Sequence, residues 1–188
     1  MKLNKIVTQV VSIIVFATAL LALAVSCVSP AGKVNYLKKQ IPEAKQFLED
    51  HEESLHIVLS VQNRIDDVMY MLFTDDELRV FDFSEGKWGD RLLTASVHEC
   101  DFLSDEEKWA FMDLLSSPEA QSFQSFFIIV RPVETRINLM SYSDGLSRDY
   151  ADMIVRNGMP SDLPNSSRFY QEQVDDIWYI EISHTPGV

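Results

Sequence analysis

The chain has 188 residues, of which 29 are acidic and 16 are Lys or Arg, so its formal net charge is −13. Such an acidic surface repels nucleic-acid phosphates and anionic lipid headgroups, and we therefore exclude nucleic acid as a partner. Hydrophobic residues make up 46% of the chain and aromatic residues 11%. This composition excludes a disordered chain and predicts a packed core.

The first 27 residues follow the order of an export signal. Lys2 and Lys5 precede an apolar run from Ile6 to Val25, and this run leads into the sequence Ala24-Val25-Ser26-Cys27. A positive segment, an apolar segment and small residues before the cleavage point are typical of signal peptides. With a cysteine directly after the small residues, the pattern resembles the signal peptide and lipobox of bacterial lipoproteins.

This resemblance implies that residues 1–26 are removed and that Cys27 carries lipid as the new N-terminus. It also implies a place in the bacterial cell envelope, outside the cytoplasm, with the chain anchored to the membrane by lipid. Residues 27–33 are then the lipidated N-terminus and a linker, and residues 34–188 suit a single domain. Loss of the two lysines changes the net charge of the mature chain from −13 to −15.

Two alternatives to lipidation remain open at this stage. The apolar run is long enough to cross a bilayer as an uncleaved helix, because about 20 residues span the hydrocarbon core. Ordinary signal cleavage is the second alternative, and it leaves Cys27 available for a disulfide with Cys100. All three interpretations export the folded domain across the membrane.

The segment from Val34 to Ile65 predicts mainly helix, because apolar side chains recur at steps of three and four residues. The members of this face are Ile41, Ala44, Leu48, His51, Leu55, Val58, Gln62 and Ile65. Alternation between Leu55 and Val61 is a strand-like alternative. The pattern leaves open whether the helix is continuous.

Two runs rich in β-forming residues, Val68 to Phe73 and Leu78 to Phe83, predict a hairpin around a polar turn. A loop from Ser84 to Gly89 follows. Ser104 and Glu107 have the spacing of a capping box, which predicts that a second helix begins there.

The most apolar stretch of the domain, Phe123 to Val130, predicts a central strand. The run from Arg136 to Tyr142 returns beside it as a second hairpin. Helical spacing then predicts a third helix, on the residues Leu146, Tyr150, Met153 and Ile154, which ends at Asn157-Gly158. Ile177 to Ile182 is the last predicted strand.

The elements therefore follow the order α-ββ-α-ββ-α-β. Hairpins separated by helices predict an α+β fold, with an antiparallel-rich sheet of about five strands and three helices packed on it.

Sequence motifs for catalysis and cofactors are missing. The six glycines lie at 32, 86, 89, 145, 158 and 187, which excludes the standard dinucleotide, P-loop and nucleophile-elbow spacings. His51 and His56 lie five residues apart and point about 140° away from each other on a helix. We expect His51 to be a hydrogen-bonded histidine at the core edge. His98 and Cys100 supply two ligands where structural zinc usually needs four, so we assign no metal, cofactor or catalytic residue.

Two features remain as candidates for binding. One is the densest polar cluster, at a predicted strand-to-helix transition, which includes Ser143, Asp144, Ser147, Arg148 and Asp149. The other is Trp88, which lies between two glycines and suits an exposed platform for a ligand. The alternatives are structural: Ser143 or Asp144 as a helix N-cap, and Trp88 folded back onto the core.

Export signals and missing motifs favour a binding module over an enzyme. The charge predicts a basic protein, peptide or envelope component as the partner, with association that weakens as salt rises. The alternatives are a hydrolase whose carboxylates assemble only in the fold, and an immunity-type protein that neutralises a basic toxin.

Overall fold

The computed structural model describes residues 29–82, 91–122, 125–143 and 149–186. Its strands are β1 (Val68–Phe73), β2 (Glu77–Asp82), β3 (Arg91–Ser96), β4 (Phe127–Arg131), β5 (Glu134–Tyr142), β6 (Tyr150–Arg156), β7 (Phe169–Gln173) and β8 (Tyr179–Thr185). Its helices are α2 (Pro30–Lys38), α3 (Ile41–Asp50), α4 (Glu52–Arg64), α5 (Asp105–Leu115) and α6 (Pro118–Ser122), with a short 3-10 helix at Val97–Glu99.

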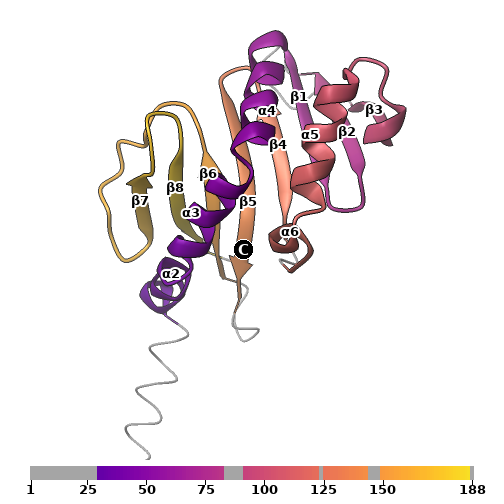
Figure 1. The fold of residues 1–188 in the computed structure, drawn as a ribbon. Coiled ribbons are helices and arrows are strands. Elements are labelled where there is room, and N and C mark those ends of the chain that lie inside the picture. Colours follow the sequence, from indigo (N-terminus) through magenta and orange to yellow (C-terminus); the bar gives the residue numbers. More distant parts are fainter. Residues whose placement is uncertain (1–28, 83–90, 123–124, 144–148, 187–188) are drawn as a thin grey trace, which may run out of the picture.

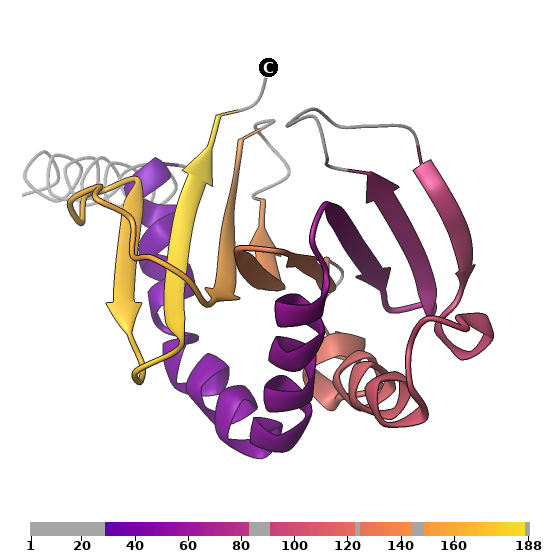
Figure 2. The ribbon, with the colours of Figure 1, turned by 90° about the horizontal axis from the view of Figure 1, so that it is seen from above.

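The strands form one antiparallel sheet in the order β3-β2-β1-β4-β5-β6-β8-β7 (Figure 1). The helices of the described residues lie on one side of this sheet (Figure 2). The predicted α+β class and the antiparallel sheet are therefore confirmed. The predicted counts of about five strands and three helices are wrong, because the described residues form eight strands and five α-helices.

The core lies between the helices and the middle of the sheet. Ile128 and Val130 of β4 are fully buried, as the apolar stretch predicts, and β4 pairs with β1 and β5 on its two sides. Helix α4 packs over β4 and β5, while α2 packs over β6 and β8. Trp178, directly before β8, and Ile180 within it close the core at the other end of the sheet.

The first helical segment consists of three helices rather than one. Helix α2 ends at Lys38 and α3 begins at Ile41, and His51, with a φ of −117° and a ψ of 24°, separates α3 from α4. Residues 30–33 were predicted as linker, yet they belong to α2, where the Ser29 side chain caps the helix by accepting from the Gly32 N–H at 3.0 Å. The predicted apolar face is nevertheless confirmed, because Leu55 and Val58 are buried in the core.

Two local predictions are confirmed by hydrogen bonds. The Glu107 N–H donates to the Ser104 side chain at 3.2 Å, and the Ser104 N–H donates to the Glu107 carboxylate at 2.8 Å, which completes the capping box. His51 Nδ1 lies 2.8 Å from Asp113 Oδ2, and only 12% of the histidine side chain is exposed. It is therefore a hydrogen-bonded histidine at the core edge.

The predicted third helix is wrong, because most of that segment is strand β6. Ala151, Met153 and Val155 are buried against the helices, while Asp152 and Ile154 lie on the opposite face of the sheet. Spacing alone is ambiguous here, since residues four positions apart share a face in both a helix and a strand. Backbone pairing with β5 on one side and β8 on the other overrides the helical pattern.

Strands β3 and β7, the two edges of the sheet, were not predicted. β7 has the polar sequence Phe-Tyr-Gln-Glu-Gln, which carries little strand signal. A side chain provides hydrogen bonds to the backbone of this strand at Gln171. Asn165 Oδ1 accepts from the Gln171 N–H at 2.7 Å, and Asn165 Nδ2 donates to the Gln171 carbonyl at 3.3 Å. A side chain thus takes part of the role of a further strand at this edge.

A buried polar network joins α4 to the sheet. Gln62 Oε1 accepts hydrogen bonds from Thr135 Oγ1 and from Asn157 Nδ2, both at 2.8 Å. Asn157 Oδ1 in turn accepts from the Thr135 N–H at 2.6 Å. Asn157 was predicted to end a helix, and it instead follows the last residue of β6.

We expect Gln62→Leu to destabilise the fold by about 1–3 kcal/mol, because it leaves the Thr135 hydroxyl and the Asn157 amide buried without their acceptor. Urea unfolding measures this change. The exposed neighbour provides the control, and Asn63→Leu should alter the free energy of unfolding by less than about 0.5 kcal/mol. Equal effects of the two variants would contradict the structural role of the network.

Candidate functional site

A groove lies on the helix side of the molecule, between α3, α4, the start of α5 and the turn that joins β7 to β8. Its volume is about 750 Å³. We call it the acidic groove, and its lining consists of Lys45, Leu48, Glu49, Glu52, Glu53, Leu55, His56, Ile57, Leu59, Glu106, Val174, Asp175, Ile177 and Trp178.

The floor of the acidic groove is apolar. Leu48, Leu55 and Trp178 are buried beneath it, while Ile177 is 44% exposed at its edge. The β7–β8 turn holds this wall in place, because Asp175 Oδ1 accepts from the N–H groups of both Ile177 and Trp178 at 2.7 Å. Side-chain capping of the turn therefore fixes an exposed apolar residue beside a buried aromatic one.

The rim of the groove is acidic. Glu49, Glu52, Glu53 and Glu106 are exposed, and no hydrogen bond or ion pair joins any of their carboxylates to another described residue. Glu52 and Glu53 also lie in the first turn of α4, where the helix dipole favours negative charge. That local role explains their place in the helix, but it leaves their outward oxygens free for a ligand.

Lys45, which lines the groove, is paired within the fold. Lys45 Nζ lies 2.5 Å from Glu172 Oε1, and the Tyr170 hydroxyl donates to the other oxygen of Glu172 at 2.6 Å. These hydrogen bonds, that of Lys45 first, lower the pKa of the Glu172 carboxyl. The same carboxylate raises the pKa of Tyr170 to about 12. Lys45 therefore does not offset the charge of the rim.

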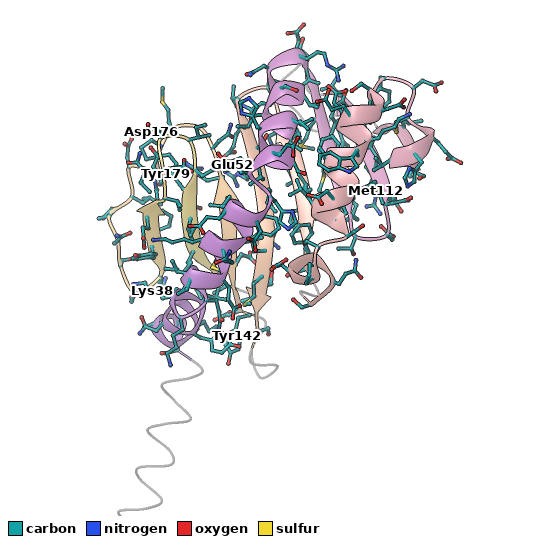
Figure 3. All side chains as sticks on the ribbon, in the orientation of Figure 1. Lys38, Glu52, Met112, Tyr142, Asp176 and Tyr179 are labelled. Atoms are coloured by element: carbon teal, nitrogen blue, oxygen red, sulfur yellow. The ribbon has the colours of Figure 1, made fainter. Side chains whose placement is uncertain are left out.

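The groove lies towards the upper end of the domain in the view of Figure 3. Glu52 on α4 and Asp176 in the β7–β8 turn are both labelled in the upper half of the molecule in Figure 3. Lys38 and Tyr142 lie towards its lower end, beside α2. The acidic groove is thus separated from the end of the domain at which the chain enters.

The described residues of the polar cluster predicted from the sequence, Ser143 and Asp149, are not part of this groove. Ser143 directly follows β5, and Asp149 directly precedes β6. The Asp149 carbonyl accepts from Lys33 Nζ at 2.9 Å, and its carboxylate Oδ2 lies 3.6 Å from His184 Nε2. Most of the helix that Ser143 or Asp144 was expected to cap is strand β6, which begins at Tyr150, and Asp144 itself lies outside the described residues.

The other predicted site residues, Cys27, Trp88, Asp144, Ser147 and Arg148, lie outside the described residues. The residues of the acidic groove were not singled out from the sequence. Glu49, Glu52 and Glu53 have the pattern of a solvated helix face, and only the fold brings the β7–β8 turn beside them. The one available signal was the acidic pair Asp175-Asp176 at a strand end.

Comparison with known proteins does not assign the chain to a family. No protein-family model, no curated protein and no solved structure matches it. Within the described ranges, no three His, Cys, Asp or Glu side chains are grouped so as to hold a metal ion. Of the helices in that part of the chain, none is long and apolar enough to cross a membrane.

We expect Glu172→Gln to lower the pKa of Tyr170 from about 12 towards the ordinary tyrosine value of about 10, because the neighbouring negative charge is removed. NMR titration of the Tyr170 ring measures the change. Folding stability at neutral pH should fall by less than about 1 kcal/mol, since the Lys45–Glu172 pair is partly exposed. Glu43→Gln is the control, and an unshifted Tyr170 in Glu172→Gln would contradict the assignment.

Proposed function

We propose that the chain is a lipid-anchored extracytoplasmic binding module, and that its acidic groove takes a segment of a basic protein, peptide or envelope component. The observation that carries this proposal is the combination of an apolar floor with four exposed carboxylates that lack partners among the described residues. A segment with basic and apolar side chains complements both parts. Its alkyl stems cover the floor while its charged ends reach the rim.

The chemistry of the groove favours a cationic ligand at this particular site, beyond the general attraction of cations to an acidic protein. Neutral or acidic partners would leave the rim carboxylates desolvated without compensation, which is unfavourable. A basic toxin is one partner of the required chemistry, so an immunity-type role is a special case of this proposal. A hydrolase that uses the same carboxylates is the alternative, and it predicts cleavage of the bound segment.

The start of α2 supports attachment close to a membrane surface. Ser29 caps this helix and is separated from Cys27 by a single residue. Two residue steps span at most about 7 Å. With lipid on Cys27, the α2 end of the domain would rest near the membrane, and the acidic groove would lie towards the other end.

We expect a fluorescent decapeptide of alternating Lys and Leu to bind the chain, with an affinity that falls as salt rises from about 0.05 to 0.5 M. Glu52→Gln combined with Glu53→Gln should weaken this binding about tenfold, equivalent to about 1.4 kcal/mol. Fluorescence anisotropy measures both effects. A peptide of alternating Glu and Leu should not bind.

The matched control is Asp66→Asn combined with Asp67→Asn, which removes the same charge from an exposed turn outside the groove. This control should change the affinity less than twofold. Equal weakening by the two double variants would mean that net charge alone attracts the peptide. Cleavage of the peptide during the measurement would favour the hydrolase instead.

We expect Cys27→Ser to release the protein from the membrane fraction of a bacterial cell, because lipid can no longer be attached. A pair of acyl chains holds a protein stably, since each buried methylene contributes about 0.8 kcal/mol. Cys100→Ala is the control and should remain in the membrane fraction, because Cys100 is buried within the domain. Full retention of Cys27→Ser would show that the apolar run is an uncleaved anchor.

A further inference from the structure

The face of the sheet turned away from the helices carries a second hollow, with a volume of about 390 Å³. We call it the sheet hollow. Outward side chains of β4, β5, β6 and β8 line it, and those used below are Phe127, Asn138, Ser141, Tyr150, Asp152 and Ile154. It is separate from the acidic groove, which lies on the helix side of the molecule.

Strand register brings these residues together. Ser141 on β5 lies opposite Asp152 on β6, and Asn138 lies opposite Ile154 on β6 and Phe127 on β4. The Ser141 hydroxyl donates a hydrogen bond to Asp152 Oδ1, and Asn138 Nδ2 lies 3.4 Å from the same hydroxyl oxygen. A carboxylate, a hydroxyl and an amide therefore form one connected polar group between apolar neighbours.

Asp152 has no counter-ion among the described residues. The nearby guanidinium groups are engaged elsewhere, because Arg136 Nε donates to Glu134 at 2.7 Å and Arg156 Nη1 donates to Glu134 at 2.9 Å. Burial raises the pKa of the Asp152 carboxyl, while the hydrogen bond from Ser141 lowers it. A half-buried carboxylate without a cation is unfavourable, and such groups in proteins are usually paired.

A second acceptor in the sheet hollow also lacks a partner. Asn138 is only 4% exposed, and its Nδ2 donates to the Ser125 carbonyl at 2.8 Å, which fixes the orientation of the amide. Its Oδ1 is buried and has no hydrogen-bond donor in the described part of the chain. Most buried polar atoms in proteins are hydrogen-bonded, so a hydrogen-bond donor on a bound ligand would stabilise this oxygen.

We propose that the sheet hollow binds a primary ammonium group carried on a short alkyl chain. An ammonium has three N–H donors and a positive charge, which suit the free oxygen of Asp152 and the unpaired oxygen of Asn138. Ile154 and Phe127 offer an apolar surface to the alkyl chain. The Tyr150 ring, 38% exposed at the edge, adds a face on which a cation is favoured.

The geometry favours ammonium over guanidinium. A guanidinium group pairs best with both oxygens of a carboxylate at once. Ser141 already occupies Oδ1 of Asp152, so that carboxylate offers a single oxygen. A compact cation with donors that point in several directions matches separate acceptors better than a planar fork does.

The probes are n-butylamine, n-butylguanidine and n-butanol, titrated into the full chain purified in detergent and followed by NMR. We expect n-butylamine to bind saturably, and the other two to bind at least tenfold more weakly. Asp152→Asn should weaken n-butylamine binding at least tenfold. Glu53→Gln, which removes one charge from the acidic groove, should leave it unchanged and so separates this site from the proposed function.

Ser141→Ala provides a test that does not remove the charge. It frees the second oxygen of Asp152, so n-butylguanidine should gain affinity relative to n-butylamine by at least threefold. The proposal is overturned if Asp152→Asn binds n-butylamine as well as the wild type does, or if Glu53→Gln weakens it equally. It is also overturned if n-butanol binds as tightly as n-butylamine.

Discussion

Gln62 fixes the helical layer over the middle of the sheet, and much of the architecture depends on that contact. Its side-chain oxygen is shared by Thr135 on β5 and Asn157 at the end of β6, so one residue of α4 sets the position of the helix relative to two strands. Apolar packing alone permits a helix to slide along a sheet, because hydrophobic contacts have no direction. A buried and satisfied polar network defines one position. The wall of α4 that lines the acidic groove is fixed with it.

Because the described helices cover only one face of the sheet, the two faces have different surroundings and different side chains. The helix face buries an apolar core and leaves a groove where α3, α4 and the β7–β8 turn meet. The opposite face carries polar residues between apolar ones, and some of them pair along a strand or across strands. Glu134 bonds to Arg136 beside it and to Arg156 across the strands, and Arg156 also lies 3.5 Å from Glu181. On the same face, Asp152 has no counter-ion and Asn138 Oδ1 has no hydrogen-bond donor among the described residues.

Sequence patterns predicted the elements whose stability is local or strongly periodic. The capping box of α5, the β1–β2 and β4–β5 hairpins and the buried face of the N-terminal helices all follow from short-range signals. β6 was mistaken for a helix because Tyr150 and Ile154, four residues apart, share a face in either a helix or a strand, and only pairing with two neighbouring strands decides between them. β7 is polar, and Asn165 satisfies part of its edge. The acidic groove combines residues more than 100 positions apart, and no local signal reports that proximity.

The pairing of cations within the fold determines how much negative charge the acidic groove presents to solvent. Lys45 is bound to Glu172, Arg64 to Glu107, and Arg156 to Glu134, so these positive charges are held within the fold. The exposed carboxylates of the groove rim therefore face solvent with no cation among the described residues close enough to pair with them. Under the proposed function, an incoming basic segment would not have to displace an internal lysine or arginine before it binds. That arrangement would lower the desolvation penalty of the proposed association and let long-range attraction set its rate.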